Sequence, residues 1–229
     1  MSPPTSDLHH RAWRATAIFL VVLLVVLFLP AWTLNYWQAW VYWLIYAASS
    51  IAGTAYLLKV DPALIERRLA VGPVAEQEGS QRRIMTFLSV CYVLLLVIPG
   101  FDQHWHWSDV PAWLVWLGQA GSILGYAMIF VVVRENSYAA ATIRVEAEQP
   151  VISTGPYAIV RHPMYSGALP MLGCTPLALG SYWGLLVDIA TFAGLAWRLI
   201  DEEQFLMRNL PGYGDYCRNV RYRLIPFVW

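Results

Sequence analysis

The sequence predicts an all-α membrane protein: a polytopic bundle of four spanning helices followed by a short C-terminal helical hairpin. Hydrophobic residues make up 58% of the 229 residues and charged residues only 13%, against roughly 25% charged residues in an average soluble domain. Apolar runs of about 20 residues, the length that crosses a bilayer, recur through the first part of the chain. The 12 tryptophans and 13 tyrosines fit aromatic anchoring at the bilayer interfaces, and many lie near the ends of these runs.

The first two spans follow from an interval without formal charge between Arg14 and Lys59. This interval is long enough for two helices, over residues 15–34 and 39–58, joined by a tight turn. Asp61-Pro62 then predicts an N-cap and a first helical position, and so the start of a short helix at the membrane surface.

Two more charge-free runs predict spans over residues 84–101 and 112–133, which complete a four-helix transmembrane region at residues 1–133. Residues 102–109 between them alternate histidine and tryptophan and include two aspartates. We interpret them as an interfacial aromatic loop and expect no metal site there. The three cysteines, Cys91, Cys174 and Cys217, are far apart in the sequence and indicate neither a disulfide framework nor a zinc site.

The last apolar stretch, residues 164–197, is interrupted at 180–184 by glycine, serine and aromatic residues. Each half has about 15–17 residues, so the stretch predicts a short helical hairpin, and its length leaves open whether it crosses the bilayer. Asp188 lies inside the second half, where we expect a buried, hydrogen-bonded carboxylate facing the bundle.

Orientation is predicted from the basic residues. All 15 lysines and arginines lie before residue 15, within 59–83, within 134–161, or from 198 onward. The positive-inside rule therefore places both termini and the long polar segments in the cytoplasm, in a bacterial inner membrane as we expect. The formal net charge is zero, which gives no basic field for nucleic acid.

The polar residues with the clearest functional signal are in the segment 154–167, TGPYAIVRHPMYSG, directly before the hairpin. An arginine and a histidine at the mouth of an apolar run indicate a site. The flanking glycines and prolines indicate a fixed backbone that allows close approach. The competing interpretation is a basic loop that only sets orientation. A second polar group, Asp201-Glu202-Glu203, ends the hairpin, and adjacent glutamates on a helix point about 100° apart.

Taken together, these elements resemble a known family. Gly155-Pro156-Tyr157, Arg161-His162-Pro163-Met164-Tyr165, Gly167 and Glu202-Glu203, with Tyr213, Tyr216 and the run 223–226, are similar to the isoprenylcysteine carboxyl methyltransferases. The related phospholipid methyltransferases share the RHPxYxG and EE elements. The similarity covers residues 134–229, which we take as a C-terminal methyltransferase region. It implies an integral membrane enzyme whose S-adenosylmethionine is enclosed by cytoplasmic segments of this half. No glycine-rich dinucleotide motif follows a strand in the sequence, in agreement with this.

The resemblance implies that His162, Tyr165, Gly167, Glu202 and Glu203 bind the cofactor. The chemistry of a sulfonium cation, an amino-acid end and a ribose diol adds Tyr157 to this set. We include Gly155, from the same Gly155-Pro156-Tyr157 element of the resemblance. This chemistry leaves open which glutamate contacts the cofactor.

For catalysis we name three candidates. Arg161 would orient a carboxylate acceptor, with Arg198, Arg218 and Arg221 as alternatives. Glu203 would remove a proton from a thiol or an amine, a task that His162 would also suit. Asn136, with Tyr138 beside it, would line the acceptor side. The acceptor is a lipophilic or small molecule at the interface, with membrane lipids as neighbours; its identity and the oligomeric state stay open. The rival interpretations are an NADPH-dependent membrane sterol-type reductase and a nonenzymatic membrane protein.

Overall fold

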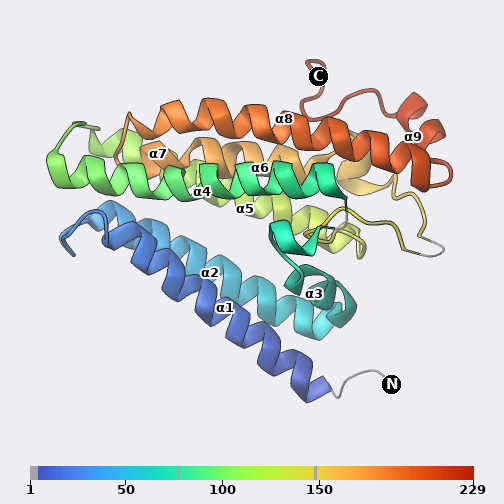
Figure 1. The fold of residues 1–229 in the computed structure, drawn as a ribbon, viewed down its shortest axis with the longest axis horizontal. Helices are drawn as coiled ribbons and strands as arrows, with labels where there is room; N and C mark the ends of the chain where they lie inside the picture. The colour runs from blue at the N-terminus through green and yellow to red at the C-terminus, as the bar shows by residue number, and fades with distance from the viewer. Residues whose placement is uncertain (1–4, 77, 147–148) are drawn as a thin grey trace.

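The computed structural model describes residues 5–76, 78–146 and 149–229, and all the regular elements in these residues are helices (Figure 1). α1 (Thr5–Phe28) and α2 (Trp37–Val60) form the predicted first hairpin. α1 begins before the predicted residue 15, because its polar first turns also bury side chains. Leu8 and Ala12 pack in a cluster with Leu58 and Ile65.

The predicted surface helix is α3 (Pro62–Leu69). The Asp61 side chain accepts a hydrogen bond from the Leu64 N–H at 2.9 Å, which is the N-cap interaction expected from the sequence. A single 3₁₀ turn, η1 (Pro73–Ala75), follows.

The third and fourth helices, α4 (Gly79–Trp105) and α5 (Ala112–Glu135), are both longer than predicted. The predicted loop at 102–109 is correspondingly shorter, since its first four residues continue α4. Asp102 is buried there. It accepts hydrogen bonds from the Ser108 N–H at 2.7 Å and the Ser108 hydroxyl at 2.6 Å, so this aspartate closes the α4–α5 turn.

Within the described residues, four helices are long and apolar enough to cross a membrane: Asp7–Phe28 within α1, α2, α4 and α5. Their outward surfaces are apolar, and Val21, Val22, Leu117 and Leu124 are each more than half exposed. Apolar surface of this extent suits contact with lipid. The predicted four-span bundle is therefore confirmed.

The predicted hairpin is present, but its two limbs are unequal. The first limb consists of α6 (Pro163–Gly173) and the single turn α7 (Thr175–Ala178). The second limb, α8 (Gly184–Asn209), has 26 residues, more than the 15–17 predicted, because the charged residues after Trp197 continue the helix. Asp188 is buried as expected. Its Oδ1 atom, however, has no hydrogen-bond partner within the described residues, contrary to the expectation of a satisfied carboxylate.

The end of the first limb is held by buried polar side chains. The Tyr36 hydroxyl donates to the Leu179 carbonyl oxygen at 2.6 Å, and Gln119 Nε2 donates to that of Ala178 at 2.9 Å. These bonds satisfy carbonyl groups that the short helix cannot pair internally.

The hairpin packs closely on the preceding helices: α6 and α7 lie against α5, and α8 lies against α4. Contact with α5 is close because its facing residues are glycines. A Cβ added at Gly118 would meet the backbone N of Ala178, and one at Gly125 would lie 2.6 Å from the backbone N of Met171. The segment between α5 and α6, the surface helix α3 and α9 (Tyr213–Asn219) then lie at one end of the bundle (Figure 1).

Candidate active site

The turn that contains Arg161 and His162 is fixed by the C-terminal tail. The Arg161 N–H donates to the Tyr222 carbonyl oxygen at 2.9 Å, and the His162 N–H donates to that of Arg223 at 3.0 Å. Pro163 then begins α6, at a position where a helix has no use for an N–H. The tail therefore fixes the backbone positions from which the Arg161 and His162 side chains extend.

Glu203, near the C-terminal end of α8, joins this turn to the tail. Its Oε1 accepts from Arg161 Nη1 at 3.0 Å and contacts His162 Nε2 at 3.3 Å, and its Oε2 accepts from Arg223 Nε at 2.9 Å. Burial alone would raise the pKa of Glu203, but the hydrogen bonds from His162, Arg223 and Arg161 outweigh burial and lower this pKa to about 2. Glu203 is therefore an ionised anchor with its acceptor atoms occupied.

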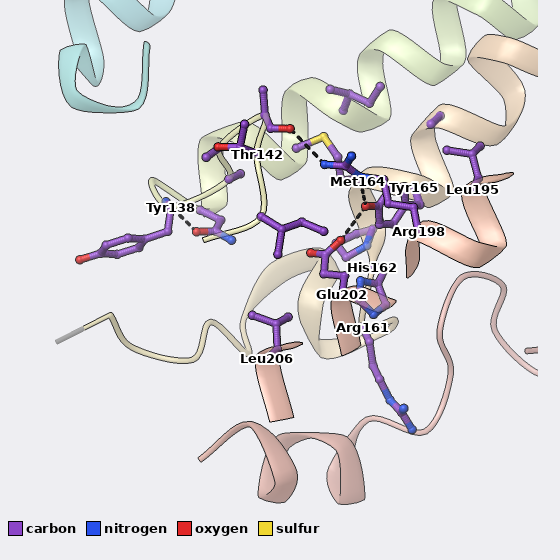
Figure 2. Close-up of a pocket in the computed structure, with 18 of the residues that line it drawn as sticks. Tyr138, Thr142, Arg161, His162, Met164, Tyr165, Leu195, Arg198, Glu202 and Leu206 are labelled. Carbon is purple, nitrogen blue, oxygen red and sulfur yellow. Dashed lines mark hydrogen bonds between the residues drawn. The ribbon is translucent and has the colours of Figure 1, made fainter. Parts of the chain in front are cut away.

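Glu202 points to a different partner. The Tyr165 hydroxyl donates to Glu202 Oε2 at 2.6 Å, and Arg198 Nε donates to that hydroxyl at 3.0 Å. Figure 2 shows these three side chains joined in a row. Burial and the negative charge of Glu202 raise the pKa of Tyr165 well above its ordinary value, so the phenol keeps the proton that it donates.

The two arginines of the site differ in how their donors are used. Arg161 makes its bond to Glu203 and points toward the tail (Figure 2). Its remaining bonds go to the carbonyl oxygens of Val220, Cys217 and Arg221. Arg198 is only 6% exposed, and its Nη1 atom has no hydrogen-bond partner within the described residues. Arg198 therefore keeps a free buried donor, whereas the donors of Arg161 are largely used within the fold.

Asn136 and Tyr157, named from separate parts of the sequence, are in direct contact. Asn136 follows the last residue of α5 and its Nδ2 donates to the Tyr157 hydroxyl at 2.9 Å. Tyr157 belongs to the 3₁₀ helix η2 (Gly155–Ala158). Burial raises the pKa of Tyr157 to about 12, so this hydroxyl is neutral at physiological pH.

These side chains border a cavity of about 630 Å³ at the end of the bundle (Figure 2). Six of the residues predicted from the sequence line it: Asn136, Tyr157, Arg161, His162, Tyr165 and Glu202. The opposite wall is apolar and comes from α4, α5, α6 and α8, with Leu88, Tyr92, Ile129, Met171, Leu172 and Leu195 among its residues. The cavity thus has a polar end at the RHP turn and an apolar part between the helices.

The other three predicted residues, Glu203, Gly155 and Gly167, lie outside the lining of this cavity. Gly167 gives α6 close contact with α5, since an added Cβ would be 2.8 Å from Ile129 Cγ1. Gly155 has a φ of 55° and faces Glu135, whose Cδ would be 2.8 Å from an added Cβ. In the structure these two glycines shape the backbone around the site.

The sequence interpretation named Tyr138, which lines the cavity, but missed Glu76 and the residues that follow Tyr138, 139–146. Glu76 is 2% exposed and binds Arg198, and residues 138–144 form one wall of the cavity. Nothing in the local sequence separates Glu76 from Glu78, which is exposed. Glu76 is buried and Glu78 exposed because the tertiary fold brings Arg198 to Glu76.

Comparison with known proteins agrees with the geometry. Residues 113–212 match the phospholipid methyltransferase family. Protein-S-isoprenylcysteine O-methyltransferase B of Arabidopsis thaliana is 29% identical over 140 residues, which cover 58% of this chain and 66% of the relative. This part of the chain is thus similar to phospholipid methyltransferases and to an isoprenylcysteine methyltransferase. The resemblance seen in the RHPxYxG and EE elements is thereby confirmed.

A second similar protein has a different kind of name. The nickel-cobalt-cadmium resistance protein NccN of Alcaligenes xylosoxydans xylosoxydans is 26% identical over 135 residues, which cover 56% of this chain and 57% of the relative. The chain thus spans less than two thirds of the length of each of these two curated relatives.

Proposed function

We propose that the protein transfers a methyl group from S-adenosylmethionine to a lipophilic or small acceptor at the cytoplasmic face of a membrane. The observation that supports this best is the cavity itself. It joins the RHP turn and Glu202 at a polar end to an apolar wall between helices. One end therefore offers partners for a charged cofactor, and the other offers space for an apolar chain.

The residues present fit the cofactor. Glu202 supplies a carboxylate for an ammonium or a ribose hydroxyl group, and Tyr157 and Tyr165 supply aromatic surface near a sulfonium. Arg198 supplies a buried guanidinium with one nitrogen, Nη1, that has no hydrogen-bond partner within the described residues. A buried donor without a partner costs free energy, and a bound carboxylate would satisfy it.

In this proposal the two glutamates have separate tasks. Glu202 lines the cavity and contacts the cofactor, while Glu203 positions Arg161 and His162 from behind the wall. A carboxyl with a pKa of about 2 is also a weak base. The proton of a thiol or amine acceptor would therefore pass to His162 or Glu202, both of which reach the cavity.

Methyl transfer requires few further functional groups from the protein. S-adenosylmethionine supplies an electrophilic methyl group, and transfer relieves the positive charge on sulfur. The protein therefore contributes chiefly alignment and exclusion of water. Asn136 holds the Tyr157 ring through its 2.9 Å bond, which fixes one side of the cavity. A carboxylate acceptor needs no base, whereas an amine or a thiol does.

The cellular setting is part of the proposal. We propose, from the distribution of basic residues, that both termini and the cavity lie on the cytoplasmic side and that the membrane is a bacterial inner membrane. We assign the four-helix region to residues 1–133 and the methyltransferase region to residues 134–229. Met85, Leu88 and Ile129 of the first region also line the cavity, so both regions would be needed for activity.

The test is a thermal-shift experiment on the purified protein in detergent, with S-adenosylmethionine, S-adenosylhomocysteine and NADPH in parallel. A ligand that binds the folded state raises the melting temperature. We expect both sulfur compounds to raise it and NADPH to leave it unchanged. A shift with NADPH alone would contradict the proposal in favour of a reductase, and no shift with any of them would favour a nonenzymatic protein.

A further inference from the structure

Glu76 lies outside the residues 113–212 that match the family, in the connector between η1 and α4. Its side chain is fully buried, and both carboxylate oxygens accept a hydrogen bond. Arg198 Nη2 donates to Oε1 at 2.9 Å, and the Ile143 N–H donates to Oε2 at 3.1 Å. One carboxylate therefore joins a cavity-lining arginine to a cavity-lining segment.

The Ile143 contact belongs to a segment, residues 137–146, that we name the strap. The strap is held from one side by three charged residues of 61–76. Arg67 binds the Glu146 carboxylate through two nitrogens at 2.8 Å and the Ser137 carbonyl oxygen at 2.9 Å. Arg68 Nη1 donates to the carbonyl oxygen of Ala139 at 2.9 Å. Glu76 differs from both arginines because it alone of the three also binds Arg198.

The Arg198 contact leads into the polar end of the cavity. Arg198 donates hydrogen bonds both to Glu76 and to the Tyr165 hydroxyl, and this hydroxyl donates in turn to Glu202. A long guanidinium without a fixed counterion can adopt several rotamers, so its orientation depends on the buried carboxylate. Loss of Glu76 would leave Arg198 with its bonds to the Tyr165 hydroxyl at 3.0 Å and the Ala141 carbonyl oxygen at 3.2 Å but without its buried carboxylate partner, so the guanidinium that holds Tyr165 against Glu202 would be less firmly oriented.

We infer that Glu76 is a positioning residue for the methyl-transfer site, which orients Tyr165 and Glu202 through Arg198 and holds the strap through Ile143. The inference rests on the proposed function for the ligand. It extends that function to a residue in the N-terminal half, where the sequence shows no family motif.

The informative variant is Glu76→Gln, because it keeps the volume of the side chain. An amide has one acceptor oxygen, so its NH₂ group must face either Arg198 or the Ile143 N–H, both of which are donors. The matched control is Glu78→Gln, two residues away and exposed. We expect Glu76→Gln to weaken S-adenosylmethionine binding by about tenfold and to increase hydrogen exchange at the Ile143 amide, while Glu78→Gln changes neither.

A double-variant cycle separates positioning from a general loss of stability. If Glu76 acts through Arg198 and Tyr165, adding Glu76→Gln to Tyr165→Phe should weaken binding by less than about twofold further. Fully additive effects, or unchanged cofactor affinity in Glu76→Gln, would overturn the inference. Failure of the wild-type protein to bind S-adenosylmethionine would contradict the proposed function. The Ile143 exchange distinguishes the two failures. Faster exchange in Glu76→Gln without any S-adenosylmethionine binding to the wild type would overturn the assignment to a methyl-transfer site and leave Glu76 as a residue that holds the strap, whereas unchanged exchange would overturn the strap contact as well.

Discussion

Glu202 and Glu203 are neighbours in the chain with different surroundings, because adjacent residues on a helix point about 100° apart. Glu203 faces two arginines and a histidine, and Glu202 faces Tyr165 and the cavity. This difference leads to opposite expectations for the same chemical change at the two positions.

We predict that Glu203→Gln lowers the stability of the free protein by about 3 kcal/mol, because Arg161, His162 and Arg223 lose their shared counterion. Glu202→Gln should instead leave the melting temperature within a few degrees and weaken S-adenosylmethionine binding by about tenfold to hundredfold. Thermal melting and titration calorimetry in detergent measure both quantities. Equal cofactor affinities for Glu202→Gln and the wild type would refute the assignment.

The low pKa of Glu203 also predicts how stability depends on pH. The carboxyl titrates at about 2 in the folded protein, against an ordinary value of 4.5. A pKa that is lower in the folded state stabilises the fold above the ordinary value, and this stabilisation is lost as the pH falls toward the folded value. The difference in melting temperature between wild type and Glu203→Gln should therefore be constant above about pH 5.5 and shrink between pH 4.5 and pH 3. A difference that stays constant down to pH 3 would show that Glu203 does not titrate as described.

For individual residues, the sequence predicted the site best where several candidate site residues lie close together in the chain. Arg161, His162 and Tyr165 lie within five consecutive positions, and the glutamate pair about forty residues later meets them in the structure. The sequence does not say which glutamate faces the cavity, because this depends on the rotation of the helix about its axis, and a rotation of about 100° exchanges them. It also gives no hint of Glu76, whose partner Arg198 is 122 residues away.

At the scale of elements, the helical hairpin reaches its position by close contact with α5. Gly118 and Gly125 lie where a side chain would collide with α7 and α6. Small residues that let helix backbones approach are a common device of membrane bundles. The apolar wall of the cavity depends on this approach, since α5 and α6 both contribute to it.

We predict that Gly118→Ala destabilises the protein by about 2 kcal/mol, because the new Cβ meets the backbone of Ala178 and backbone atoms cannot move aside cheaply. Gly53→Ala in α2 is the matched control, with nothing within 4 Å of its added Cβ. It should be neutral or stabilising by up to about 1 kcal/mol, since alanine is the better helix former. Equal melting temperatures for the two variants would contradict the close packing.

The lengths of the elements were less predictable than their number. The apolar run alone indicated 15–17 residues for the second limb of the hairpin, whereas α8 continues to Asn209. Arg198 and Glu203 are buried inside the bundle, where their partners come from other segments, so their charges do not end the helix. The same reason extends α4, whose Gln81 and Asp102 are buried and hydrogen-bonded, whereas α1 is extended by the burial of Leu8 and Ala12. A helix length predicted from an apolar run leaves out helical residues whose polar side chains are paired by tertiary contacts.

At the scale of the whole molecule, the polar segments gather at one end of the bundle (Figure 1). The cavity opens among them, so membrane orientation decides which compartment supplies the cofactor. Because S-adenosylmethionine is a cytoplasmic metabolite, the account needs this end to face the cytoplasm.

Reporter fusions test the orientation. Alkaline phosphatase fused after Trp229 should be inactive in a bacterial host, because the enzyme folds only outside the cytoplasm, and a fusion at Ser108 should be active. A fluorescent protein at the same two positions serves as the complementary control. An active phosphatase after Trp229 would place the cavity on the wrong side of the membrane.

The most direct measurement of the central claim is ultraviolet cross-linking of radiolabelled S-adenosylmethionine to the purified protein, followed by peptide mapping. The account predicts saturable labelling that S-adenosylhomocysteine displaces, on peptides from 157–165 or 198–206 that line the cavity. Saturable labelling confined to peptides away from the cavity, or no displaceable labelling, would contradict it.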